Sequence, residues 1–70
     1  MQKLSNAAAG RYIIKWIFTE PEIRENLKSI QIEEGKGVTV LSNIHKGGLL
    51  LRSDAGSFYV DCEALAGITV

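Results

Sequence analysis

Short strand-forming segments, separated by turn residues at intervals of about ten positions, are the feature that most constrains the fold of this chain. Runs of β-branched and aromatic residues favour strands because such side chains fit a pleated, half-buried surface. Strands are expected at residues 11–19, 38–41, 49–52, 57–61 and 68–70. Several short strands with turns between them indicate a mainly β fold. They favour a small closed or nearly closed barrel over an open sheet.

The first of these segments, RYIIKWIFT at Arg11–Thr19, is apolar on both faces. Alternation places two sets of side chains on opposite sides of the strand: Tyr12, Ile14, Trp16 and Phe18 on one, and Ile13, Lys15 and Ile17 on the other. Three arrangements explain this pattern. A β-bulge shifts the alternation midway, another element covers the second face, or the second face is an exposed patch for a partner.

One helix is expected directly after this strand. Thr19–Glu22 matches a capping box, and Pro21 in the first turn supports the same boundary because its nitrogen has no hydrogen to donate. Ile23, Leu27 and Ile30 then recur at helical spacing and form one narrow apolar stripe. This helix is expected to lie on the barrel as a lid and to end before the turn at Gly35–Gly37.

The second half of the chain is expected to contain hairpins. Segments 38–41 and 49–52 should pair antiparallel, and Ser53–Gly56 has the order of a type I turn closed by a left-handed glycine. Asp61 is expected to cap a single helical turn over Cys62–Leu65.

Length and composition restrict the class of protein. Seventy residues suffice for a single domain, 1–70, and an apolar fraction of 46% with 23% charged residues is typical of a globular chain. Eight basic and eight acidic residues alternate along the sequence, which predicts no nucleic-acid partner. Cys62 is the only cysteine, so no internal disulfide forms and a reducing, cytoplasmic location is expected.

Export and membrane insertion are not expected. Residues 1–10 lack the apolar run of a secretory signal. The longest apolar stretch, Tyr12–Phe18, is interrupted by Lys15 and is far shorter than the roughly 20 residues of a membrane helix.

No catalytic residues and no cofactor site are predicted. Gly35–Gly37 and His45–Gly48 combine glycine with lysine, but neither follows the pattern of a phosphate-binding loop that opens a helix. No nucleophile occurs with a base and an orienting acid at a recognisable spacing. A chain this small also has little room for a cavity of about 300 Å³, the size of ordinary small-molecule sites.

No metal site is predicted either. His45 is a lone loop histidine, and it could ligate a metal only if the fold brought it together with Cys62 and Glu63. Cys62 is expected to be a small buried apolar residue, as free cysteines usually are.

An apolar surface remains as the candidate binding site. Simple alternation sends Ile13, Ile17 and Tyr59 outward, and a patch rimmed by Lys15 and Asp61 would suit a protein partner. The alternative is that a bulge or the helix buries these residues, because a small barrel needs its apolar side chains for stability.

Several spacings together resemble the FeoA family. They are Leu4-x-x-Ala7-x-x-Gly10, Ile23 with Leu27-x-x-Ile30-x-Ile32-x-x-Gly35-x-x-Val38-x-Val40, Gly47-Gly48, and Ala64-x-x-x-Ile68-x-Val70. The resemblance covers nearly the whole chain. Departures occur at Gln31, where the family commonly has glycine, at Glu34, where it often has proline, and at Glu20-Pro21, which replaces a glycine-rich connection.

The resemblance implies a small SH3-like β-barrel with one inserted α-helix. It also implies a cytosolic, non-enzymatic accessory protein of bacterial ferrous iron transport, whose partner is FeoB, the membrane transporter with a GTPase domain. A self-associating module, with a homodimer as its product, and a metal-sensing domain using His45 and Cys62 are the alternatives.

Overall fold

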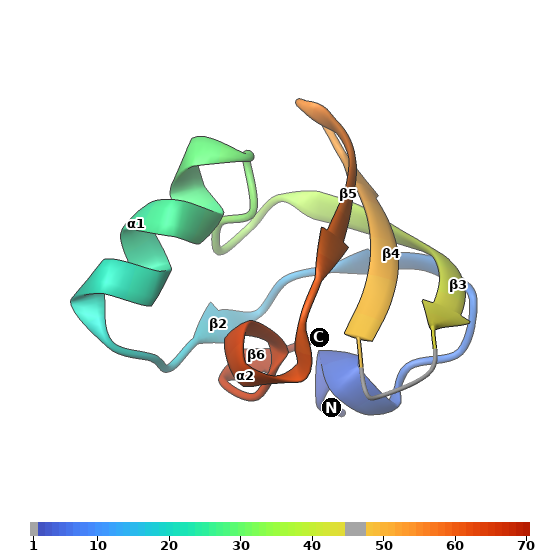
Figure 1. The fold of residues 1–70 in the computed structure, drawn as a ribbon, viewed down its shortest axis with the longest axis horizontal. Helices are drawn as coiled ribbons and strands as arrows, with labels where there is room; N and C mark the ends of the chain where they lie inside the picture. The colour runs from blue at the N-terminus through green and yellow to red at the C-terminus, as the bar shows by residue number, and fades with distance from the viewer. Residues whose placement is uncertain (1, 45–47) are drawn as a thin grey trace.

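The computed structural model describes residues 2–44 and 48–70. Strands dominate the chain, and one helix, α1, is inserted between the second and third strands, so the expected mainly β class with an inserted helix is confirmed (Figure 1). The elements in chain order are η1 (Leu4–Asn6), β1 (Gly10–Ile13), β2 (Trp16–Ile17), α1 (Pro21–Ser29), β3 (Gly37–Ile44), β4 (Gly48–Ser53), β5 (Gly56–Val60), α2 (Cys62–Leu65) and β6 (Ile68–Thr69).

Four strands form one antiparallel sheet in the order β1-β3-β4-β5. The predicted pairing of segments 38–41 and 49–52 is confirmed by the β3–β4 register, in which Val40 lies opposite Leu51. The β4–β5 hairpin turns at Asp54 and Ala55, with Ser53 opposite Gly56. Gly56 has φ +130°, a conformation that favours glycine, as the turn predicted.

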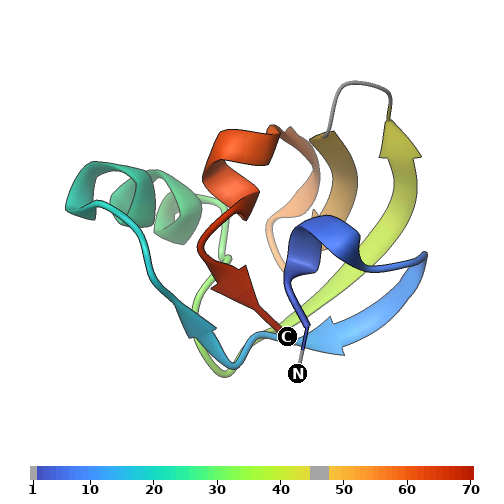
Figure 2. The ribbon, with the colours of Figure 1, turned by 90° about the horizontal axis from the view of Figure 1, so that it is seen from below.

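A second, smaller sheet contains β2 and β6, which pair antiparallel. The N-terminal segment adds to the other side of β6, where Lys3 bridges Thr69. The Gln2 amide donates to the Val70 carbonyl at 3.0 Å, and the Val70 amide donates to the Gln2 carbonyl at 2.9 Å. The two ends of the chain therefore lie side by side (Figure 2).

A corner at Ile14 and Lys15 joins the two sheets. The Ile14 amide donates to the Lys36 carbonyl at 3.0 Å, and the Ile14 carbonyl accepts from the Gly35 amide at 2.8 Å. One residue later, the Lys15 amide donates to the Thr69 carbonyl at 2.8 Å. The single strand predicted over 11–19 is therefore wrong: the chain leaves the partnership with β3 and joins β6 within two residues.

α1 begins at Pro21, but its first turn is not capped as the sequence predicted. The N-cap residue is Glu20, and no side chain accepts a hydrogen bond there, so the capping box from Thr19 is wrong. The apolar stripe is confirmed. Leu27 is buried, and Ile23 and Ile30 pack partly buried against the core.

α1 ends in a Schellman motif centred on Gln31. This residue has φ +63°, and its amide donates to the Lys28 carbonyl at 3.0 Å, while the Ile32 amide donates to the Leu27 carbonyl at 2.9 Å. Leu27 and Ile32 are both buried, which supplies the apolar contact that accompanies this motif. Glycine is the usual residue at such a position because it adopts left-handed backbone without strain.

The short helix α2 forms as predicted. Asp61 is its N-cap, and the Asp61 carboxylate accepts a hydrogen bond from the Ala64 amide at 3.0 Å. This turn buries Leu65 completely.

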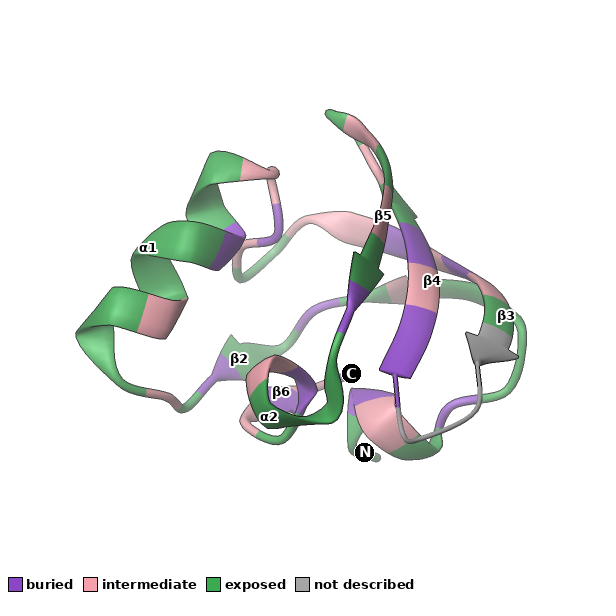
Figure 3. Ribbon diagram, in the orientation of Figure 1, coloured by how far each residue is buried: buried purple, intermediate pink, exposed green. Residues whose placement is uncertain are grey.

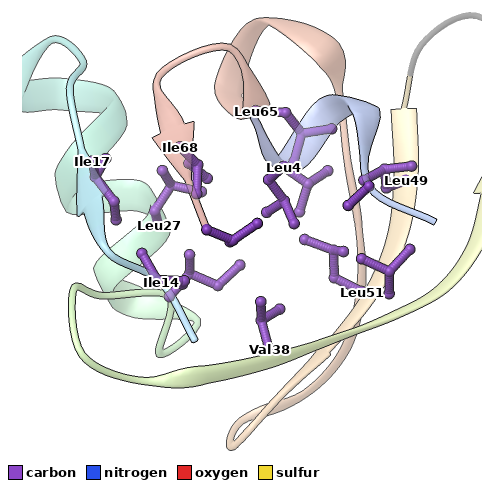
Figure 4. Close-up of a cluster of buried hydrophobic side chains, with 14 residues drawn as sticks. Leu4, Ile14, Ile17, Leu27, Val38, Leu49, Leu51, Leu65 and Ile68 are labelled. Carbon is purple, nitrogen blue, oxygen red and sulfur yellow. The ribbon is translucent and has the colours of Figure 1, made fainter. Parts of the chain in front are cut away.

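One apolar core lies between the two sheets and the helices (Figures 3 and 4). Its buried members come from η1, α1, α2, every strand except β1, and the segments between them: Leu4, Ala7, Ile14, Ile17, Leu27, Ile32, Val38, Val40, Leu49, Leu51, Val60, Leu65, Ile68 and Val70. α1 lies at one end of the molecule, beside β2, and contributes a single fully buried side chain (Figure 1). Most of its surface is exposed (Figure 3).

Candidate partner-binding groove

A shallow groove of about 520 Å³ follows β2 where this strand faces α1. Its lining combines two aromatic side chains with one positive and one negative side chain. The lining residues are Trp16, Ile17, Phe18, Thr19, Arg24 and Glu34.

The corner at Ile14 and Lys15 explains why the aromatic residues are exposed. Ile14 and Ile17 point into the core, so the alternation shifts by one position between them. Trp16 is 43% exposed, and Phe18 is 86% exposed, the highest value among the large apolar side chains of the described residues. Large apolar surface left in water marks interaction sites when it is contiguous and bordered by polar groups.

The floor of the groove is the free edge of β2. β6 pairs with only one edge of β2, so the amide and carbonyl of Ile17 on the opposite edge need other partners. Glu34 Oε2 accepts a hydrogen bond from the Ile17 amide at 2.9 Å, and Arg24 Nη2 donates to the Ile17 carbonyl. Two side chains therefore satisfy the backbone groups that a neighbouring strand would otherwise bind.

Arg24 and Glu34 also pair with each other. Arg24 Nη1 lies 3.5 Å from Glu34 Oε1, and the two side chains are 45% and 44% exposed. The hydrogen bond from the Ile17 amide, together with the charge of Arg24, lowers the pKa of Glu34 below its ordinary value, although partial desolvation opposes this shift. Glu34 is thus held as a carboxylate, the form that accepts this hydrogen bond.

A turn over residues 33–36 positions Glu34. The Lys36 amide donates to the Glu33 carbonyl at 3.1 Å, and Lys36 Nζ binds Gln31 Oε1 at 2.7 Å and Glu33 Oε2 at 3.6 Å. Because the same turn is bonded to the backbone of Ile14, it carries Glu34 alongside the β2 edge.

A second hollow of about 180 Å³ shares Ile17, Arg24 and Glu34 with the groove. Its remaining lining residues belong to α1 and to the segment after it: Glu25, Lys28, Ile32 and Glu33. The Arg24–Glu34 pair therefore borders both hollows along the β2 edge.

The predicted patch of Ile13, Ile17 and Tyr59 does not exist as one surface. Ile17 is 3% exposed and belongs to the core, so its predicted outward orientation is wrong. Ile13 and Tyr59 are each 53% exposed, as expected, but they lie on β1 and β5, the two outer strands of the four-stranded sheet. The Tyr59 ring covers the backbone of Gly48, where a β-carbon would collide with it.

The residues considered for a metal site are not brought together within the described part of the chain. Cys62 is exposed, so the expectation that it is buried is wrong. Glu63 follows it on α2 and is also exposed. His45 lies outside the described residues. Over residues 2–44 and 48–70, no three cysteine, aspartate, glutamate or histidine side chains are grouped as metal ligands would be.

Lys36, between Gly35 and Gly37, belongs to the turn that carries Glu34, and its Nζ contacts the side chains of Gln31 and Glu33. The other glycine-rich segment, His45–Gly48, lies outside the described residues except for Gly48. None of the helices in the described chain has the length and apolar character needed to cross a membrane.

Sequence reasoning missed the residues that build this groove. Trp16 and Phe18 were placed on the inward face because the alternation was counted through the corner. Arg24 lies outside the apolar stripe predicted for α1, and Glu34 was noted only as a departure from the family pattern. The pairing of Arg24 with Glu34 across ten positions leaves no local signal in the sequence.

Comparison with known proteins identifies the fold. The solution structure of FeoA protein from Chlorobium tepidum matches with a TM-score of 0.84 and 24% sequence identity, over 97% of this chain and 67% of that one. No protein-family model matches the sequence. No curated protein matches it either. The chain therefore has the SH3-like fold of FeoA, as the resemblance predicted.

Proposed function

We propose that this protein is an accessory protein of ferrous iron transport, which acts in the cytosol by binding the cytosolic part of a FeoB-type transporter and catalyses no reaction itself. The single observation that carries the proposal is the fold shared with FeoA over nearly the whole chain. The spacings of apolar residues and glycines that resemble the FeoA family point to the same role.

The groove along β2 supplies a contact surface for this role. Its aromatic walls, Trp16 and Phe18, are the kind of side chain enriched at protein interfaces. Its two charged side chains, Arg24 and Glu34, bind each other and the Ile17 backbone. This arrangement suits the recognition of a polar backbone or of charged groups better than it suits proton transfer to a substrate. Binding is thus the activity that the groove supports best.

The proposal is tested by a pull-down of the purified protein against the cytosolic part of the ferrous iron transporter from the same cell. The assay is repeated with GDP and with a GTP analogue, and a soluble protein of similar size and net charge serves as the control bait. Binding above the control supports the accessory role, and a difference between nucleotides shows that the GTPase cycle regulates it. Absence of binding in both nucleotide states overturns the proposal.

A second candidate function is self-association, because Trp16 and Phe18 offer apolar surface to a second copy as readily as to a transporter. Sedimentation equilibrium over a hundredfold dilution separates the two candidates. A dimer that dissociates on dilution and is lost in Phe18→Ser favours the self-associating module, whereas a monomer throughout favours the accessory role. The sequence also predicts contacts at Ile13 and Tyr59, which lie on β1 and β5 and form an alternative to the groove as the place where a partner binds.

A further inference from the structure

Side chains, and not a neighbouring strand, cover the free edge of β2. Ile17 is the β2 residue whose amide and carbonyl are bound by side chains on that edge. Glu34 gives the Ile17 amide an acceptor, and Arg24 gives the Ile17 carbonyl a donor. A residue of an adjacent antiparallel strand would supply the same two groups, its carbonyl and its amide, because paired residues exchange both N–H···O bonds. The two side chains thus occupy a position that a polypeptide backbone would fit.

This cover is easily displaced. Both side chains are nearly half exposed, and their charged atoms are 3.5 Å apart. Exposed ion pairs of this kind contribute little to stability, because water and salt screen the charges. A backbone that bonds Ile17 directly replaces the hydrogen bonds that Arg24 and Glu34 give up.

We propose that the β2 edge binds an extended segment of the transporter's cytosolic part by strand addition, with Arg24 and Glu34 moving outward as the segment pairs with Ile17. The proposal rests on the function proposed above and names the form of the partner at that site. Main-chain hydrogen bonds supply the affinity in such complexes, and pockets for alternate side chains supply the specificity.

The geometry of a strand predicts the sequence of the segment. Residues on either side of the one paired with Ile17 face the same way as Trp16 and Phe18, and aromatic walls favour apolar side chains there. The central residue points the opposite way, toward the smaller hollow of about 180 Å³ that contains Ile32 and Lys28. The segment is therefore apolar at two positions separated by one residue.

The displaced charges keep partners in the complex. An added strand lies about 4.8 Å from β2 and presents its own free amides and carbonyls on the far side. Arg24 and Glu34 are long side chains anchored on α1 and on the turn over residues 33–36, so they reach these groups by moving outward. The guanidinium donor and carboxylate acceptor then bind the added strand as they bind Ile17 in the free protein.

An extended segment fits this edge better than a second copy of the chain does. Arg24 on α1 reaches the Ile17 carbonyl, so the helix stands within one side-chain length of the β2 edge. A second copy would have to bring its own α1 to the same place, so two helices would crowd the edge where an extended segment meets only one. An extended segment brings no helix of its own to the edge.

The test uses overlapping synthetic peptides of about ten residues that cover the transporter's cytosolic part, titrated into the full-length protein. We expect one peptide to bind and its central sequence to be apolar at alternate positions. N-methylation at the amide that faces β2 should weaken binding at least about tenfold, whereas methylation of an amide outside the segment that pairs with β2 should not. Chemical shifts of the Ile17 amide should change on binding.

A variant pair locates the site on the protein. Phe18→Ser should weaken binding about tenfold, because it removes an aromatic wall that is already exposed and leaves the core intact. Tyr59→Ser, which removes an exposed aromatic residue from β5, should change binding less than about twofold. Thermal unfolding of both variants is recorded to show that they are folded.

The outcomes separate this proposal from the function on which it rests. If the transporter's cytosolic part binds but Phe18→Ser binds equally well, or Tyr59→Ser loses binding in its place, the groove is overturned and the accessory role stands. If N-methylation of the amide that faces β2 leaves peptide binding unchanged, strand addition is overturned. If the protein dimerises and Phe18→Ser abolishes the dimer, the β2 edge binds a second copy, and strand addition by the transporter is also overturned. Failure of the wild-type protein to bind the transporter overturns both proposals.

Discussion

The backbone of Gly67 lies directly against the backbone of Phe18: the Phe18 amide donates to the Gly67 carbonyl at 2.7 Å, and a β-carbon on Gly67 would collide with the Phe18 carbonyl group. This contact fixes Phe18, the residue after β2, against Gly67, the residue before β6. Replacing glycine here requires one backbone to move, and both are anchored by hydrogen bonds.

Gly67→Ala should therefore lower the free energy of unfolding by about 2 kcal/mol or more, the cost typical of overpacked sites. Urea denaturation followed by tryptophan fluorescence measures it, since Trp16 lies two residues from the contact. Ala66→Ser at the exposed neighbouring position is the control and should change stability by less than about 0.5 kcal/mol. A Gly67→Ala protein as stable as the wild type would contradict the contact.

Gln31→Gly should be more stable than Gln31→Ala by about 1 kcal/mol, because the left-handed backbone at this position strains a β-carbon and glycine has none. Both variants lose the hydrogen bond from Lys36, so their difference isolates the backbone effect. Chemical denaturation of the two proteins at one pH gives the comparison. Equal stability of the two would show that Gln31 is not strained.

Stability should fall at acid pH partly through Glu34. A carboxyl whose pKa is lowered by folding stabilises the native state fully above its ordinary pKa, here 4.5, and this contribution disappears as the pH falls through the lowered value. Glu34→Gln should flatten this part of the pH profile, measured as the free energy of unfolding between about pH 3 and 7. Glu25→Gln, at an exposed position of α1, is the matched control and should keep the wild-type slope. Parallel profiles for Glu34→Gln and wild type would argue against the Ile17 and Arg24 contacts.

Ile17→Asp should unfold the protein, because it buries a carboxylate in the apolar core. The milder Ile17→Ala should lower the free energy of unfolding by about 2–4 kcal/mol through the cavity that it leaves. Circular dichroism and thermal melts measure both variants, and Ile13→Ala on the exposed face of β1 should change stability far less. A folded Ile17→Asp protein would show that residue 17 lies at the surface and not in the core.

Local patterns in the sequence predicted much of the fold. The β3–β4 pairing, the β4–β5 hairpin and the Asp61 cap each join segments that are neighbours in the sequence, so their signals are visible without the tertiary structure. The apolar stripe of α1 was visible for the same reason. The Thr19 capping box failed because the helix starts at Pro21 with Glu20 as its N-cap, one residue later than the motif requires.

The candidate site could not be predicted in the same way. Its aromatic walls face outward only because the chain turns a corner at Ile14 and Lys15, and the partners that make this corner, Gly35, Lys36 and Thr69, lie far along the sequence. Alternation is reliable within one strand and loses its meaning where a strand changes sheets. Cys62 was misplaced for a related reason, since a one-turn helix with Leu65 as its buried residue leaves the first position outside.

The pairing of β2 with β6 has a consequence for the newly made chain. β2 contains residues 16 and 17, whereas its backbone partner β6 contains residues 68 and 69, so on a ribosome β2 stays without this partner until residue 69 has emerged. During that interval both edges of β2 and the side chains around Ile17 are open to other polypeptides. Pairing of β2 during synthesis therefore depends on residues 68 and 69, and a nascent chain stalled before residue 68 would be a client for chaperones.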